Sequence, residues 1–242
     1  MAKNYTNIFK RVEKKYLLTP QQHDMLLERW KDYIEPDFFP HSRISNIYFD
    51  TQDDALIRQS IEKPCYKEKL RLRAYGEVSL DSDSFLELKK KYKGVVYKRR
   101  VMLPLREAKR FLEEGISPEE NNQILREIDY CVKWYHLIPR IFIYYERDSY
   151  RGIENPDIRI TFDTKVQSRR DNLELESNLK GDLLSSEELW VMEIKVPMAY
   201  PLWLSRTLSE LKIYPVSFSK YGQIYTKERM AAEDDGCKIL IN

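Results

Sequence analysis

Several short stretches of the sequence alternate aliphatic residues with Arg, Lys or Glu. The clearest stretch is residues 69–73 (KLRLR), and residues 193–195 (EIK) and 159–161 (RIT) repeat the pattern. Successive side chains of a β-strand point to opposite faces, so each stretch places its charges on one face and its aliphatic side chains on the other. Guanidinium and ammonium groups donate hydrogen bonds to phosphate oxygens, and carboxylates bind divalent cations. We therefore predict a sheet face that binds a polyanion together with a divalent metal.

Four cations lie in line on the strand that we expect at residues 65–75. Lys67, Lys69, Arg71 and Arg73 are two residues apart, so neighbouring side chains on this face are about 6–7 Å apart. This spacing matches a short chain of phosphates, and each guanidinium can donate two parallel hydrogen bonds. The same alternation is also typical of an ordinary sheet with one face in water. Because five expected strands share the bias toward Arg and Lys, we favour a binding face.

Three carboxylates lie two residues before a Lys in expected strands. The pairs are Glu13 with Lys15, Glu87 with Lys89, and Glu193 with Lys195. A carboxylate among cations can ligate a metal, hold the neighbouring cations by ion pairing, or serve solubility alone. We predict Glu193 as the principal metal ligand, with Glu13 and Glu87 as further candidates. Structural ion pairing is the leading alternative for all three.

The expected charged face carries far more positive charge than the chain as a whole. Its members are Arg11, Glu13, Lys15, Lys67, Lys69, Arg71, Arg73, Glu87, Lys89, Lys91, Arg147, Arg159, Asp163, Glu193, Lys195 and Lys220. Twelve are cations and four are acids, so the face sums to +8 while the chain of 242 residues sums to +2. The remaining residues are therefore acidic overall. Such an exterior would direct a small anion inward and disfavour binding to nucleic acid.

Composition argues against several other kinds of site. The three Cys form no CxxC pair, the three His are scattered, and no P-loop or dinucleotide fingerprint occurs. The sequence contains no apolar run of about 18 residues, and its first residues lack an apolar signal segment. We expect a cytoplasmic, soluble protein without a membrane segment in this chain.

The order of elements indicates an α+β fold centred on one large antiparallel sheet. We expect strands at residues 8–18, 44–50, 65–75, 84–91, 95–102, 140–150, 157–163 and 190–196. We expect helices from residue 20 to a break at 35–36, and at 51–60, 104–114 and 201–212, with a further helix opened by a capping box at 117–120. A tight turn at Lys93-Gly94 predicts a hairpin. One domain is expected over residues 1–242, with its core at about 8–226 and a tail at 227–242.

Eight motifs follow one another along the sequence. They are residues 11–16 (RVEKKY), 48–50 (YFD), 70–76 (LRLRAYG), 87–89 (ELK), Arg147, 158–163 (IRITFD), 192–195 (MEIK) and 218–221 (FSKY). In this order they resemble VTC domains, the polyphosphate polymerase domains of the triphosphate tunnel metalloenzyme (CYTH-like) superfamily, from residue 8 to about residue 226. One such motif would be weak evidence, whereas eight in order are specific.

The resemblance implies a closed, eight-stranded antiparallel β-barrel with a basic tunnel and with helices packed around it. It also implies transfer of the ATP γ-phosphate onto a growing polyphosphate, with Mn²⁺ or Mg²⁺ as the metal. By position in the motifs, the phosphate contacts fall to Lys15, Arg71, Arg73, Lys89, Arg147, Arg159, Lys195 and Lys220, and Glu193 would hold the metal. The expected catalytic set consists of Lys15, Arg71, Arg73, Arg159, Glu193 and Lys195.

Two positions depart from the family pattern. Arg11 stands where the superfamily usually has the first Glu of Glu-x-Glu-x-Lys, a metal ligand typical of the hydrolases, and this favours the polymerase branch. Ser217 stands where polymerase members of the eukaryotic complex have a Lys, which would weaken the hold on the product or accompany a different acceptor. Two other functions stay open: hydrolysis of tripolyphosphate or nucleoside triphosphates, and non-catalytic binding of polyphosphate or inositol phosphates. A separate membrane partner could collect the product.

Overall fold

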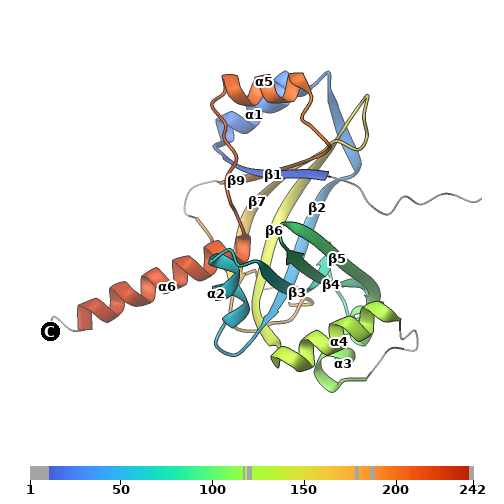
Figure 1. Ribbon diagram of the computed structural model, residues 1–242, viewed down its shortest axis with the longest axis vertical. Helices are drawn as coiled ribbons and strands as arrows, with labels where there is room; N and C mark the ends of the chain where they lie inside the picture. Colours follow the sequence, from blue (N-terminus) through green and yellow to red (C-terminus); the bar gives the residue numbers. More distant parts are fainter. Residues whose placement is uncertain (1–10, 117, 119–121, 178–179, 186–188, 240–242) are drawn as a thin grey trace, which may run out of the picture. The chain divides into compact units, whose positions relative to one another are not determined.

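The structure is a computed structural model that describes residues 11–116, 118, 122–177, 180–185 and 189–239. Figure 1 shows the arrangement of its helices and strands. In chain order they are β1 (Arg11–Leu18), α1 (Pro20–Trp30), β2 (Ile34–Asp50), α2 (Ala55–Ile61), β3 (Tyr66–Tyr75), β4 (Asp83–Tyr92), β5 (Val95–Pro104), α3 (Leu105–Glu114), α4 (Gln123–Tyr135), β6 (Ile138–Gly152), β7 (Arg159–Arg169), β8 (Asp182–Leu183), β9 (Trp190–Pro197), α5 (Leu202–Glu210) and α6 (Lys220–Ile239).

The strands form one sheet in the order β1-β9-β7-β6-β2-β3-β4-β5, with β8 paired to β7. The pairs β1–β9, β9–β7, β7–β8, β2–β3, β3–β4 and β4–β5 all run antiparallel. This arrangement confirms the predicted α+β class with a large antiparallel sheet. The order begins at β1 and ends at β5, so hydrogen bonds of the described residues do not close the sheet. A closed, eight-stranded barrel therefore stays a prediction.

The chain divides into two compact units, each made of three segments. The first unit comprises Met1–Ser42, Glu146–Lys165 and Ser185–Phe218. The second unit comprises Arg43–Tyr145, Val166–Leu184 and Ser219–Asn242. Strands β2, β6 and β7 contribute residues to both units. The single domain expected over the whole chain stays a prediction.

In the first unit, α1 and α5 lie side by side next to β1 and β9 (Figure 1). The predicted start of α1 is confirmed, because Thr19 Oγ1 accepts from the backbone N of Gln22 at 3.2 Å and the Gln22 side chain accepts from Thr19 N at 3.1 Å. Trp30 of α1 meets Trp203 of α5 edge-on, with ring centroids 5.7 Å apart. The two helices bury the aliphatic face of β1 and β9. Glu13 and Lys15 of β1 and Glu193 and Lys195 of β9 therefore lie on the opposite face.

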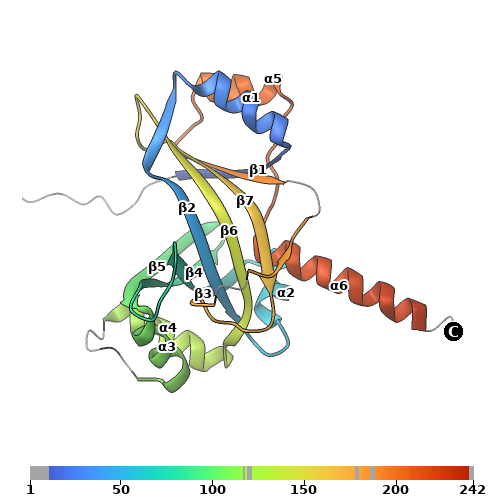
Figure 2. The ribbon, with the colours of Figure 1, turned by 180° about the vertical axis from the view of Figure 1, so that it is seen from behind.

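In the second unit, α3 and α4 pack against the hairpin-connected strands β3, β4 and β5 (Figure 2). Their shared core includes Leu70, Leu72, Leu86, Leu88, Phe111, Leu125 and Ile128. Each of the four strand leucines is at most 2% exposed, which contributes about 2 kcal/mol of apolar burial per side chain. Because side chains alternate along a strand, Arg71 and Glu87, which lie between these leucines, face away from the helices.

Three elements differ from the sequence-based expectation. β2 begins at Ile34, ten residues before the predicted strand at 44. The sequence did not predict this first part, because Pro36 and Pro40 have no N–H to donate to a sheet. α6 runs from Lys220 to Ile239, although a tail was expected from residue 227. The helix was not predicted, because its polar composition carries no apolar repeat. Of the capping box expected at 117–120, only Pro118 is described; α4 instead begins after Asn122, whose side chain accepts from Leu125 N at 3.1 Å.

Candidate functional site

In the first unit, the pairing of β9 with β1 and β7 brings five charged residues onto one face. Lys15 lies opposite Glu193, and Glu13 lies opposite Lys195. Arg159 lies opposite Lys195 on the other side of β9. Residues directly opposite each other in an antiparallel pair share a face. The structure therefore unites these five predicted site residues.

Glu193 lies between two lysines of this face. Its carboxylate contacts the Nζ of Lys195 and lies 3.7 Å from the Nζ of Lys15. The Lys15 ammonium also donates to the backbone carbonyl of Phe218 at 3.2 Å. Burial alone would raise the pKa of Glu193, but the positive charges of Lys195, Lys15 and Arg147 lower it to about 2. The carboxylate is therefore ionised at neutral pH and offers oxygen ligands.

Arg159 and Lys195 are like charges placed directly opposite each other on β7 and β9. Such pairs destabilise a sheet unless an anion lies between them. The Arg159 guanidinium lies 4.0 Å from Asp37 and its side chain is 59% exposed, so its hydrogen-bonding groups are accessible to a ligand. A phosphate group, with several oxygens and a negative charge, suits this pair.

Arg147 is oriented by a buried carboxylate. Its Nε and one Nη donate to the two oxygens of Asp163 at 2.6 and 2.8 Å, and the Asp163 side chain is 2% exposed. A bidentate pair of this kind fixes the plane of the guanidinium. Arg147 also lowers the pKa of Glu193, so it adds to the positive field around that carboxylate. We call Glu13, Lys15, Arg147, Arg159, Glu193 and Lys195 the first-unit cluster.

In the second unit, the register of β3, β4 and β5 places cations opposite cations. Lys69 lies opposite Lys89, and Lys89 lies opposite Lys98 on its other side, so three ammonium groups form a row across three strands. Lys67 and Lys91 form a further facing pair. Burial, together with the positive charges of Lys91 and Lys89, lowers the pKa of Lys67. Rows of like charge are unfavourable when empty and are suited to a polyanion.

Glu87 lies among three cations of the same face. Its carboxylate is 2% exposed and lies 2.5 Å from Arg71, 2.6 Å from Lys98 and 3.5 Å from Arg100. Burial alone would raise the pKa of Glu87, but Arg71, Arg73 and Lys98 lower it to about 2. These contacts favour the alternative that Glu87 holds cations in place over a role as metal ligand.

Two tyrosines and an asparagine orient the guanidinium groups of β3. Arg73 donates from Nε to Asn46 Oδ1 at 2.8 Å and from Nη2 to the Tyr145 hydroxyl at 2.8 Å. Arg71 donates from Nη1 to the Tyr48 hydroxyl at 3.1 Å. Burial alone would raise the pKa of Tyr48, but the charges of Arg71, Arg73 and Lys69 lower it to about 8.

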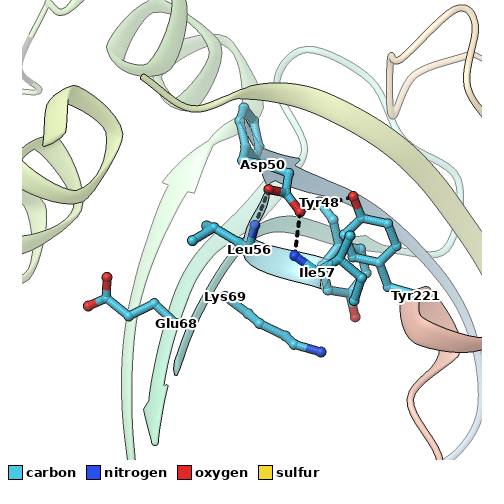
Figure 3. Close-up of a pocket in the computed structure, with 8 residues that line it drawn as sticks. Tyr48, Asp50, Leu56, Ile57, Glu68, Lys69 and Tyr221 are labelled. Carbon is cyan, nitrogen blue, oxygen red and sulfur yellow. Dashed lines mark hydrogen bonds between the residues drawn. The ribbon is translucent and has the colours of Figure 1, made fainter. Parts of the chain in front are cut away.

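The first turn of α6 is anchored by the end of β2 (Figure 3). Asp50 accepts hydrogen bonds from the backbone N of Leu56 at 2.8 Å and of Ile57 at 2.9 Å, and from the Tyr221 hydroxyl at 3.1 Å. The Tyr221 hydroxyl also lies 3.2 Å from Asp54. Two of the sequence motifs, residues 48–50 and 218–221, therefore meet at one buried carboxylate.

This anchor places the neighbouring residues of α6 beside the cations of β3. The Nζ of Lys220 lies over the ring of Tyr145, 4.2 Å from its centroid. Lys69 Nζ donates to Ser219 Oγ at 3.2 Å. The second-unit cluster, as we use the term, consists of Lys69, Arg71, Arg73, Glu87, Lys89, Lys98 and Lys220.

Sequence reasoning missed four residues that lie in or against the second-unit cluster. Of Lys98, Arg99 and Arg100, one or two were expected on the outside as plain surface charge, and Tyr48 and Tyr145 were expected to be core or wall residues. The two-residue turn at Lys93-Gly94 was the available signal for the first two, because it fixes which residues of β4 and β5 face each other. Nothing in the sequence indicated the tyrosine contacts, which depend on how β2 and β6 meet β3.

The donor set in the first unit fits a metal that arrives with a phosphate ligand. Among the described residues no three His, Cys, Asp or Glu side chains form a metal-binding group. Mg²⁺ usually takes one or two carboxylates and completes its shell with phosphate oxygens and water. Glu193 supplies such a carboxylate, and the buried hydroxyl of Thr161, directly opposite it on β7, has no hydrogen-bond partner within the described part of the chain.

Three solved structures match this chain over most of its length. A Bacillus halodurans protein proposed to be an adenylate cyclase has a TM-score of 0.54 at 17% identity, with 86% of this chain and 93% of that one covered. A Vibrio parahaemolyticus protein also proposed to be an adenylate cyclase scores 0.45 at 15% identity, covering 90% and 98%. The PH1819 protein of Pyrococcus horikoshii scores 0.44 at 11% identity, covering 90% and 99%. The first of these supports the fold. A search of curated proteins finds no match.

In both units the antiparallel sheet carries facing Arg and Lys residues with few carboxylates among them. The family model of the VTC domain matches residues 10–228, and the chain belongs to this family. The resemblance of the eight sequence motifs is thereby confirmed. Separately, no helix within the described residues has both the length and the apolar character needed to cross a membrane.

If Glu87 holds its neighbouring cations by ion pairing, the free energy of unfolding depends on the ionisation of this carboxylate at acid pH. Its pKa is lowered in the folded protein, so its contribution is present above the unfolded value of about 4.5 and is lost as the pH falls toward 2. Glu87→Gln should lower the free energy of unfolding at pH 7 by about 3 kcal/mol. Urea unfolding of both proteins should show this difference shrinking between pH 4.5 and pH 2.5. A difference that stays constant with pH would contradict the ion-pair assignment.

Proposed function

We propose that this protein is a metal-dependent phosphotransferase that moves the γ-phosphate of ATP onto a polyphosphate chain. The observation that carries the proposal is the match of the VTC domain model to residues 10–228. The first-unit and second-unit clusters support it, because each gathers Arg and Lys side chains whose positive charges suit an anionic ligand. ATP, polyphosphate and tripolyphosphate are the proposed ligands, and nucleic acid is not among them.

The proposed roles follow the sequence motifs and the contacts of each side chain. The phosphate-binding residues are Lys15, Arg71, Arg73, Lys89, Arg147, Arg159, Lys195 and Lys220, to which the register adds Lys98. Glu193 is the proposed metal ligand, with Glu13 as a secondary one. Glu87 is assigned to holding Arg71 and Lys98. The closed barrel with a basic tunnel belongs to the proposal as well, because family membership implies it.

The chemistry needs positioning and charge neutralisation more than a base. Phosphoryl transfer passes through a loose transition state with negative charge on the equatorial oxygens. A bound Mn²⁺ or Mg²⁺ would neutralise part of this charge. The Arg and Lys groups bind the remaining oxygens and hold the phosphate chain in line. A phosphate acceptor is already ionised, so no residue needs to remove its proton.

One assay separates this proposal from its alternatives. The purified chain is incubated with ATP and Mn²⁺, and the products are resolved on a gel that separates polyphosphate by length while released phosphate is measured. Long polyphosphate supports the polymerase. Released phosphate without chains identifies a hydrolase of tripolyphosphate or nucleoside triphosphates. Tight polyphosphate binding with no turnover identifies a non-catalytic binding module. Omitting the metal is the control for the metal requirement.

A further inference from the structure

The β4–β5 hairpin carries a dense and unbalanced charge. Residues 89–100 (KKKYKGVVYKRR) contain seven Lys or Arg and no acid. The strands are joined by a two-residue turn in which Lys93 has φ 44° and Gly94 has φ 87°. Both central residues of a type I′ turn need positive φ, so this turn holds the two strands in one register. Every residue from Lys91 to Arg100 is exposed.

The hairpin has two chemically different faces. One face holds Lys89 and Lys98 and belongs to the second-unit cluster. The outer face carries Tyr92 opposite Val95, and Lys90 opposite Tyr97. Tyr92, Val95 and Tyr97 are 48%, 54% and 54% exposed. The outer face is thus largely aromatic and apolar, and it also carries Lys90, which lies 3.3 Å from Glu68 of β3.

Neighbouring elements extend this outer face. Tyr66 of β3 lies opposite Tyr92, with ring centroids 6.4 Å apart. On α4, Tyr130 and Trp134 stack on each other and are 61% and 64% exposed.

The stacked pair on α4 lies on the side of the helix that meets β5. Tyr130 and Trp134 follow Glu127 by three and seven residues, so all three lie along one side of α4. Arg99 Nε of β5 lies 3.3 Å from Glu127 Oε2. The aromatic residues of α4 therefore border the outer face of the hairpin.

We propose that this outer surface docks on an anionic lipid bilayer, with Tyr92, Val95 and Tyr97 entering the headgroup boundary. Tyr and Trp favour the membrane interface, because each has an apolar ring and a polar edge. Lysines beside them, such as Lys93 at the tip of the turn, are attracted to anionic headgroups. The combination of cationic and apolar side chains on this surface favours a lipid bilayer over polyphosphate or nucleic acid. Polyphosphate or nucleic-acid backbone would match the cations, but phosphate groups give the exposed valine no apolar partner.

The proposal does not depend on the phosphotransferase activity and is tested with lipid vesicles. Co-sedimentation of the full chain is measured with phosphatidylcholine vesicles and with vesicles that contain about one third phosphatidylglycerol. We expect binding to the anionic vesicles alone, weakening as salt is added. The triple variant Tyr92→Ser, Val95→Ser, Tyr97→Ser should lose roughly tenfold or more of this binding.

Two further variants keep the test decisive. Lys93→Glu reverses one charge at the exposed turn and should weaken vesicle binding severalfold without affecting any core contact. Tyr214→Ser removes an aromatic residue of the first unit that is 68% exposed and should leave binding unchanged. All three variants should retain wild-type turnover with ATP, since none alters a residue of either cluster. If the triple variant does not fold, the effect of Lys93→Glu on vesicle binding decides whether the hairpin docks on the bilayer.

Several outcomes would overturn the proposal. They are equal binding to both kinds of vesicle, binding that neither hairpin variant changes, and a dimer of the wild type that the triple variant abolishes. Loss of polyphosphate binding in the triple variant would instead assign the surface to the phosphate chain.

Discussion

Replacing Arg71 by alanine is expected to reduce ATP-dependent phosphoryl transfer about a thousandfold. Arg71 lies in the second-unit cluster, and three of its five N–H groups contact Glu87 and the Tyr48 hydroxyl. The remaining donors are available to a phosphate. Glu87 keeps Lys98 at 2.6 Å and Arg100 at 3.5 Å after the substitution, so its buried carboxylate stays paired. The thermal midpoint should therefore change by less than about 4 °C.

The measurement is turnover with ATP and Mn²⁺ beside a thermal melt. Arg71→Lys keeps the charge but loses the planar fork, so it should recover only part of the activity. Arg106→Ala is the matched control, because Arg106 pairs at 3.0 Å with an exposed Asp81. If Arg71→Ala instead melts many degrees lower with its remaining activity in proportion to folded protein, Arg71 is a structural ion-pair residue.

Replacing Glu193 by alanine should have opposite effects on turnover and on anion binding. The carboxylate contacts Lys195 and lies 3.7 Å from Lys15, so its removal leaves the positive charges of both ammonium groups without this counter-charge. Tripolyphosphate binding without metal should then tighten severalfold. Metal-dependent turnover should fall by about two to three orders of magnitude, because the proposed metal ligand is gone.

Calorimetric titration with tripolyphosphate in a chelating buffer measures the first effect, and turnover over a range of Mn²⁺ concentrations measures the second. Glu13→Ala is the comparison, because Glu13 is an exposed carboxylate on the same face, opposite Lys195. A parallel loss of metal-free binding and of turnover would mean that Glu193 only positions the lysines.

The strand pattern was readable from the sequence wherever charged and aliphatic residues alternate. β3, β4 and β9 were predicted for this reason, and the Lys93-Gly94 turn predicted the hairpin of β4 and β5. The first part of β2 was not predicted, because Pro36 and Pro40 are typical of a loop. Both are compatible with this strand because it is exposed there. α6 was also missed, since a polar helix has no apolar period to detect.

The candidate site was predictable as a set of residues but not as a set of contacts. Alternation placed Arg71, Glu87 and Lys89 on one face, which the register confirms. It could not distinguish a metal ligand from an ion-pair partner, because that depends on which cations of the next strand lie opposite. The position of Lys98 beside Glu87 is a property of strand pairing, and the contact of Tyr48 with Arg71 depends on β2 lying next to β3.

The hydrogen bond between Asp50 and Tyr221 joins residues 171 positions apart. During synthesis, β2 and α2 leave the ribosome long before the helix that completes this carboxylate's shell. Asp50 can accept from the backbone of α2 at once, but its tyrosine partner comes only after nearly all of the sheet has been made. Lys220 can therefore reach its position over Tyr145 only after the strands of the sheet have left the ribosome.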